Sequence, residues 1–169
     1  MIAEIVVMAV LPLILAAAAG WDLASYTIPN FLQVAMFAGF VILAIAAHLP
    51  FSVIGLHLLA GLIGLAAGFT LFALGYIGGG DAKLFAAVTL WLGMHDMPAY
   101  AMAASLFGGL LTLTILAMRQ WPLPAFAARQ QWIVRLHAEK AGIPYGVALA
   151  AGAFVILPHT EIFRLAAGA

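Results

Sequence analysis

Long apolar stretches, separated by short groups of turn-forming residues, run along the whole sequence. A helix that crosses the hydrocarbon core of a bilayer needs about 20 mostly apolar residues, and most of these stretches approach that length. The pattern predicts an all-α fold, a polytopic membrane helical bundle of about six transmembrane helices that forms a single membrane-embedded domain over residues 1–169. We expect the helices at residues 2–21, 30–47, 53–75, 81–95, 97–118 and 144–163.

The composition also indicates a membrane protein. Hydrophobic residues make up 67% of the 169 positions and charged residues only 7%, which leaves too little polar surface for a soluble protein. Six basic residues balance six acidic ones, so the net charge does not indicate a nucleic-acid partner. The chain has no cysteine and its histidines follow no ligand spacing, so we expect neither a metal nor another cofactor. No basic residue precedes the first apolar stretch, which favours a retained first helix over a cleaved signal peptide.

Basic residues cluster in the longest polar segment, residues 119–143, which we call the basic loop: Arg119, Arg129, Arg135 and Lys140. Cytoplasmic loops of membrane proteins are rich in Lys and Arg, so we expect this loop in the cytoplasm. Counting helices back from it places the turn near Asp22 and the turn at residues 76–83 on the same side, with both termini outside. We expect the basic loop to lie on lipid as a short amphipathic helix, with substrate gathering as the alternative. The membrane interfaces are the expected location of the tryptophans, Trp21, Trp91, Trp121 and Trp132.

Residues 75–83 contain three consecutive glycines followed by Asp81, an unfavourable combination in a membrane segment. Glycines weaken a helix, and a charged group at membrane depth costs about 2.5 to 3.5 kcal/mol. The next predicted helix spans only about 15 residues, or about 22 Å, so Asp81 should begin it inside the membrane, after non-helical backbone. We therefore predict a functional site in which Gly78 and Gly80 let the backbone approach a substrate and adopt conformations closed to other residues. A simple helix break is the alternative.

A second aspartate, Asp22, follows the first predicted helix, at the same depth and on the same side as Asp81. Two carboxyl groups that meet in a partly dry site do not both ionise easily, so one can act as a general acid while the other deprotonates a water molecule. An aspartic protease needs this arrangement. The alternative is two independent residues, with Asp81 capping a helix and Asp22 lying in the headgroup layer.

Three short motifs lie at these boundaries: Asp22 followed after five residues by Ile28-Pro29-Asn30, then Gly78-Gly79-Gly80-Asp81, then Ile143-Pro144-Tyr145-Gly146. Together and in this order they resemble the motifs of the prepilin peptidases, also called type IV leader peptidases, which are membrane aspartic proteases of the GxGD type. The resemblance implies that Asp22 and Asp81 are the catalytic pair. It implies cleavage of the leader peptide of prepilin or pilin-like precursors at the cytoplasmic face of the bacterial inner membrane, with the precursor and the lipid bilayer as partners.

The chain is most similar to the short, peptidase-only members of the family that serve tight-adherence, Flp-type pili. Larger members carry a cysteine-bearing cytoplasmic insertion and also methylate the new N-terminus, and this chain has neither the cysteines nor room for the insertion. It departs from many relatives at Thr27, where they carry a basic residue before Ile-Pro. Any leader or lipid contact of that position is therefore not expected here.

Several residues could support the site. Lys83 could act on Asp81 or help position the substrate, or it could extend to the cytoplasmic face. Pro144, Tyr145 and Gly146 could keep a helix start open for an extended peptide, or Pro144 could occupy the first position of a helix without such a role. The glycines spaced along the third predicted helix are expected to allow close helix packing: Gly61, Gly64 and Gly68.

Two other functions fit a membrane protein with carboxylates and a broken helix. One is a small ion-coupled transporter, which would be favoured by an inverted repeat that the sequence does not show. The other is a non-catalytic subunit of a pilus or secretion machine, which would tolerate the replacement of either aspartate by asparagine.

Overall fold

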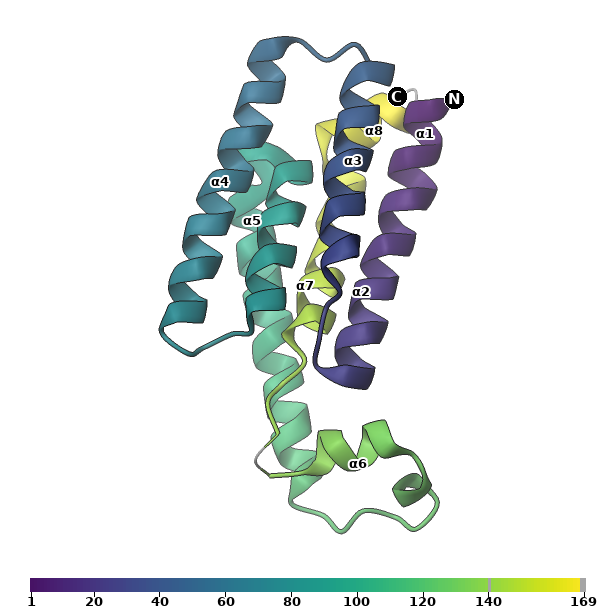
Figure 1. The fold of residues 1–169 in the computed structure, drawn as a ribbon, viewed down its shortest axis with the longest axis vertical. Helices are drawn as coiled ribbons and strands as arrows, with labels where there is room; N and C mark the ends of the chain where they lie inside the picture. Colours follow the sequence, from purple (N-terminus) through teal and green to yellow (C-terminus); the bar gives the residue numbers. More distant parts are fainter. Residues whose placement is uncertain (140, 168–169) are drawn as a thin grey trace.

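The computed structural model describes residues 1–139 and 141–167 and arranges them as a helical bundle (Figure 1). The helices are α1 (Ile2–Ile5), η1 (Val6–Val10), α2 (Leu11–Ser25), α3 (Asn30–Ala46), α4 (Phe51–Ala73), α5 (Gly79–Arg119), η2 (Ala127–Arg129), α6 (Gln131–His137), α7 (Tyr145–Ile156), η3 (Leu157–His159) and α8 (Glu161–Ala167). The first three follow one another without a break, η1 being a π-helical turn, and form one rod.

Helix α5 consists of two helices joined at a sharp turn. Gly93, in its middle, has φ of 74° and ψ of −179°, a conformation essentially restricted to glycine. The rings of Phe85 and Tyr100 stack with their centroids 5.3 Å apart, although a straight helix would separate these residues by about 22 Å. The chain therefore folds back on itself, and α5 has a first arm (residues 79–92) and a second arm (residues 94–119).

The predicted fold class, a helical membrane bundle, is confirmed. Three segments are long and apolar enough to cross a membrane, namely Ile2–Ser25, Phe51–Ala73 and Gly79–Arg119, and two shorter apolar helices cover Asn30–Ala46 and Tyr145–His159. With α5 divided into its arms, these segments match the predicted helices in number and order. Several boundaries differ from the prediction by a few residues: the fourth helix, for example, begins at Gly79 rather than Asp81, and the turn after it lies at Gly93 rather than at residues 95–98.

Gly61, Gly64 and Gly68 of α4 pack closely against a neighbouring helix, as predicted, and that helix is the first arm of α5. A Cβ atom built on Gly64 would collide with the side chain of Thr89, and one built on Gly68 would lie 2.9 Å from the carbonyl oxygen of Ala82. Such glycines let two helix backbones approach closely, which is a main source of helix association in membranes. This contact fixes the first arm, and with it Asp81, against α4.

Trp91 and His57 are buried near the turn of α5, and each is hydrogen-bonded to a backbone carbonyl of another helix. The indole of Trp91, 2% exposed, donates to the carbonyl oxygen of Met36 at 3.0 Å. The prediction that Trp91 lies at a membrane interface is therefore wrong. His57 donates from Nδ1 to the carbonyl oxygen of Leu90 at 2.8 Å, a carbonyl just before the break at Gly93, where regular helical bonding ends.

The N-terminus and helix α8 lie at one end of the bundle, and the basic loop extends beyond the other end (Figure 1). The end near the basic loop also contains the turns after α2 and α4 and the start of α7. All three motifs identified in the sequence therefore meet at this end. Lys140, which was assigned to the basic loop, lies outside the described residues.

Candidate active site

Asp22 lies in the last turn of α2 and is buried, with 4% of its surface exposed. Its Oδ2 atom accepts a hydrogen bond from the backbone N–H of Gly146 at 2.7 Å. Gly146 is the second residue of α7, and the first N–H groups of a helix have no partner within the helix. The carboxylate of Asp22 thus binds the amino-terminal end of α7, where the helix dipole stabilises negative charge.

Asp81 is the third residue of α5 and is also buried. Its Oδ2 atom accepts a hydrogen bond from the N–H of Gly78 at 3.0 Å, which caps the start of the helix. Its Oδ1 atom is buried and has no hydrogen-bond partner among the residues that the structure describes. Capping, the alternative role for this residue, therefore accounts for only one of its two oxygens.

Ile28 connects the two aspartates. A Cβ atom built on Gly146 would lie 2.8 Å from Ile28 Cδ1, and one built on Gly80 would lie 3.3 Å from Ile28 Cβ. The buried side chain of Ile28 thus packs between the glycine beside Asp22 and the glycine before Asp81. The two carboxyl groups are within electrostatic range of each other, and the Gly146 amide lies close to both. The three motifs therefore form one cluster.

The glycines of this cluster act through close packing rather than through unusual backbone conformations. Gly78 has φ of −74° and ψ of 155°, which other residues also adopt, and Gly80 is helical. The prediction that these two glycines take conformations closed to other residues is therefore wrong. The turn between α4 and α5 does contain a left-handed glycine, Gly75, with φ of 79°.

The start of α7 also differs from the expectation. Pro144 precedes the helix as its N-cap, so it does not occupy the first helical position. The N–H of Gly146 is already bound to Asp22 and is not free to pair with an extended peptide. The ring of Tyr145 lies against Gly108 on the second arm of α5, where an added Cβ would approach it to 3.3 Å.

The chain between α2 and α3 turns sharply after Asp22. Tyr26 adopts a left-handed conformation, with φ of 56°, and its N–H binds the carbonyl oxygen of Asp22 at 2.8 Å. Pro29 then precedes α3, and Asn30 begins it. The ammonium of Lys83 donates to Oδ1 of Asn30 at 2.9 Å, so this side chain joins α5 to α3.

Two arginines fix the basic loop beside the cluster, and the sequence did not indicate this role. Arg119 donates to the carbonyl oxygens of Leu136 and Gly142, and Arg135 donates to that of Ala24, two residues after Asp22. Arg119 also faces the phenol of Tyr26. Burial raises the pKa of Tyr26, and the positive charge of Arg119 opposes that shift in part. Arg119 thus ties the two ends of the basic loop together, and Arg135 attaches the loop to the end of α2.

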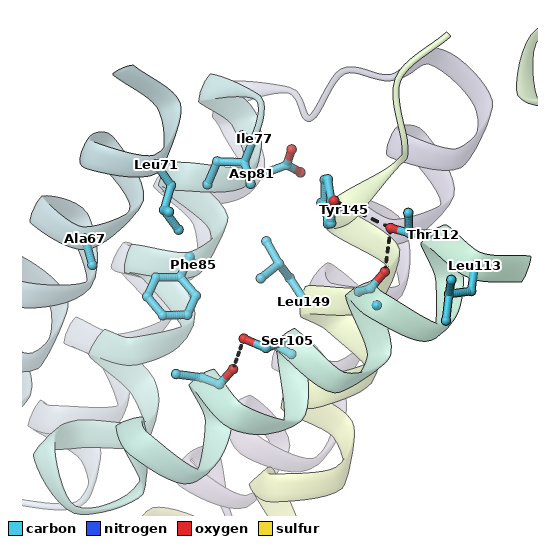
Figure 2. A pocket seen from close by; sticks show the side chains of 14 residues that line it. Ala67, Leu71, Ile77, Asp81, Phe85, Ser105, Thr112, Leu113, Tyr145 and Leu149 are labelled. Atoms are coloured by element: carbon cyan, nitrogen blue, oxygen red, sulfur yellow. Dashed lines mark hydrogen bonds between the residues drawn. The ribbon is translucent and has the colours of Figure 1, made fainter. Parts of the chain in front are cut away.

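A cavity of about 630 Å³ opens next to Asp81 (Figure 2). It lies between α4, the two arms of α5 and α7, and Figure 2 shows Asp81 and Tyr145 at one end, with Phe85 and Ser105 farther along. Sequence reasoning missed this cavity. Its signal was present in the small residues at helical spacing on the second arm, which are Ala101, Ala104, Ser105, Gly108, Gly109 and Thr112. Among the described residues, no group of three His, Asp or Glu side chains is arranged to hold a metal ion.

The fold and the cluster define a class, a polytopic helical membrane protein with two buried carboxyl groups at one end of its bundle. The sequence model of the type IV leader peptidase family matches residues 9–113, which is more than half of the chain and includes both aspartates. The protein therefore belongs to the type IV leader peptidase family and is a protease of the prepilin peptidase type. Comparisons with curated proteins and with solved structures found no significant match.

Proposed function

We propose that this peptidase is an aspartic endopeptidase, with Asp22 and Asp81 as its catalytic pair, that removes the leader peptide of prepilin or pilin-like precursors. The observation that carries the proposal is the packing of the two aspartate-bearing segments around Ile28 at one buried point, where Asp22 accepts the Gly146 amide and Asp81 Oδ1 has no partner among the described residues beside a cavity. An unpaired buried polar atom is costly in a purely structural role. A reacting water or a substrate carbonyl would supply the missing partner.

The reaction is hydrolysis of one peptide bond. One carboxylate takes a proton from a water molecule, whose oxygen attacks the scissile carbonyl carbon, while the other carboxyl, protonated, donates its proton to the carbonyl oxygen. The tetrahedral intermediate then collapses, the C–N bond breaks, and the leaving nitrogen takes up a proton. The products are the carboxyl terminus of the leader and the new amino terminus of the pilin.

We place the reaction at the cytoplasmic face of the inner membrane. Arg119, Arg129 and Arg135 all belong to the loop at the same end of the bundle as the two aspartates, and Lys83 lies two residues after Asp81 in the first arm. Basic residues are retained on the cytoplasmic side during membrane insertion. Labelling of single cysteines introduced into this cysteine-free chain, at the basic loop and near the N-terminus, would test the orientation in intact cells.

The catalytic assignment is tested by Asp22→Asn and Asp81→Asn in purified protein, with a pilin precursor as substrate. Each variant should lose cleavage by about 10³-fold or more, because general acid–base catalysis alone contributes 10²- to 10⁴-fold. Thermal unfolding in detergent should show that both variants remain folded. Asp96→Asn is a matched control, since Asp96 pairs with exposed His95 and lines a different cavity, beside Glu161 of α8. Retained cleavage by a folded Asp22→Asn or Asp81→Asn variant would overturn the assignment and favour a non-catalytic role for that aspartate.

A further inference from the structure

The cavity beside Asp81 forms a groove with an unusual distribution of polar atoms. We call it the apolar groove, and its walls include Leu71, Phe85, Ser105, Gly109 and Leu149. The hydroxyl of Ser105 is bound to the carbonyl oxygen of Ala101 at 2.7 Å, and that of Thr112 to the carbonyl oxygen of Gly108 at 2.7 Å. These groups are satisfied within their own helix, so they offer little to a ligand.

One end of the apolar groove is different. There Asp81 lines the wall, and its Oδ1 atom is buried without a partner in a side chain that is 6% exposed. A ligand that fills this groove must therefore be apolar along its length and must present a polar group at the Asp81 end only. A helix whose backbone becomes extended at one end has this property, because its last turn exposes N–H or carbonyl groups.

The dimensions also fit a helix. The lining of the second arm runs from Ala101 to Leu113, which corresponds to about 18 Å, or about three turns. Ser105 and Gly109 are exposed and have small side chains, so a second helix can approach this wall closely. Leu71 on the facing helix and Leu113 are exposed as well, which means that the groove opens sideways to the surrounding lipid.

We propose that the apolar groove binds the apolar helical segment that follows the scissile bond of the precursor, entering sideways from the bilayer. This proposal rests on the proposed function. The groove extends from Asp81 along the second arm toward the interior of the bundle, so a segment lying in it is at membrane depth while the bond to be cut is at Asp81. A basic leader does not fit there, since Asp81 is the only charged residue among the described residues that line the groove.

The test fills the groove without disturbing the aspartates. A Cβ atom at Gly109 has no neighbour within 4 Å, so Gly109→Leu is accommodated but occupies the groove. The matched control is Gly55→Leu on α4, which also has no neighbour within 4 Å and does not line the groove. Ser105→Leu is a second blocking variant, because the Ser105 hydroxyl binds only its own helix.

Each variant is assayed on two substrates, the full precursor and a short peptide that ends a few residues after the scissile bond. Gly109→Leu should raise the KM for the full precursor about tenfold or more, equivalent to about 1.4 kcal/mol of lost binding, and leave kcat/KM for the short peptide within about twofold of wild type. Gly55→Leu should change neither. Unchanged cleavage of the full precursor by both blocking variants, or an equal loss on both substrates, would overturn the groove assignment.

Disulfide cross-linking provides a readout that does not depend on turnover. In the Asp22→Asn background, Gly109→Cys should cross-link to single cysteines placed along the apolar segment of the precursor, with a period of three to four residues, while Gly55→Cys should not. Cross-links between two copies of the peptidase, or none to the precursor, would show that a second copy or lipid occupies the groove instead. If Gly109→Cys cross-links to the precursor as expected but the wild-type protein cuts neither substrate, the proposed function fails while the groove assignment stands.

Discussion

Each end of the first arm of α5 has a buried titratable side chain beside a glycine at a helix boundary, but the two side chains differ in their hydrogen bonds. At Gly93, a titratable side chain, His57, lies against a glycine at a helix break, and its ring nitrogen donates to the buried carbonyl of Leu90 just before that break. At the other end Asp81 also lies in a glycine-rich helix boundary and binds an exposed backbone group, the N–H of Gly78. A cavity is present near each of them. The difference is that Asp81 keeps one buried oxygen without a partner.

This comparison separates a structural polar site from a candidate catalytic one. Burial, glycines and a helix break occur at both ends, so none of them identifies function alone. His57 repairs a break that the fold requires, because the turn at Gly93 interrupts the regular bonding of the helix. Asp81 needs only one of its two carboxyl oxygens to cap its helix, so the other is left over. A second buried carboxyl, that of Asp22, lies within electrostatic range of it. Substitutions at the Gly93 end should therefore change stability, and those at the aspartate end should change activity.

The largest effect is expected at Gly146. In Gly146→Ala the new methyl group would lie 2.8 Å from both Asp22 Oδ2 and Ile28 Cδ1, so the carboxylate must move. Misplacement of a catalytic group by about 1 Å can cost about 10²-fold, and we expect a loss of kcat of that size with little change in thermal stability. Gly142→Ala, in the same connection but with no neighbour within 4 Å, should retain activity.

If Gly146→Ala lowered stability but kept the activity of each folded molecule, the distinction between a structural site at Gly93 and a catalytic site at the aspartates would fail. The Gly146 contact would then be structural, like that of His57.

The next effect is expected at Gly93 and concerns stability. In Gly93→Ala an alanine must adopt φ of 74° and ψ of −179°, and its Cβ would lie 2.9 Å from His57 Cε1. Strain of this type costs about 1 to 3 kcal/mol, so the midpoint of thermal unfolding in detergent should fall clearly. Cleavage by the molecules that remain folded should match wild type. Gly55→Ala, with no neighbour within 4 Å, should not lower the midpoint. A stable Gly93→Ala variant with reduced kcat would show that the distant turn contributes to catalysis.

The sequence was enough to predict that the two aspartates lie at the same end of the bundle, because counting the helices between two motifs shows whether they are at the same end. Asp22, Asp81 and Gly146 each lie beside a boundary, and the parity of the helices alone brings them to one end. The helix packing of Gly64 and Gly68 followed from their spacing on one face. These features depend on local sequence and on topology, both of which are visible in a single chain.

The features that the sequence did not reveal depend on which face of an apolar helix meets protein. In a membrane protein the lipid-facing and protein-facing sides are both apolar, so hydrophobic pattern does not distinguish them. Trp91 was expected at an interface and is instead hydrogen-bonded inside the bundle. The apolar groove was missed for the same reason. The partner of Lys83 also required the structure, since Asn30 becomes its neighbour only when α3 and α5 pack together.

The smallest effect is expected at that last contact. The hydrogen bond from Lys83 to Asn30 is exposed, and exposed charged contacts contribute about 0.2 to 1 kcal/mol. Lys83→Met and Asn30→Ala should therefore each lower stability slightly, and a double-mutant cycle on thermal unfolding should give a coupling energy within that range. Both single variants should cut the precursor with a kcat within about threefold of wild type, because neither removes a group from the aspartate cluster. If Lys83 acted on Asp81, Lys83→Met would lower kcat well below that of Asn30→Ala, and the lysine would then belong with the catalytic end of the comparison.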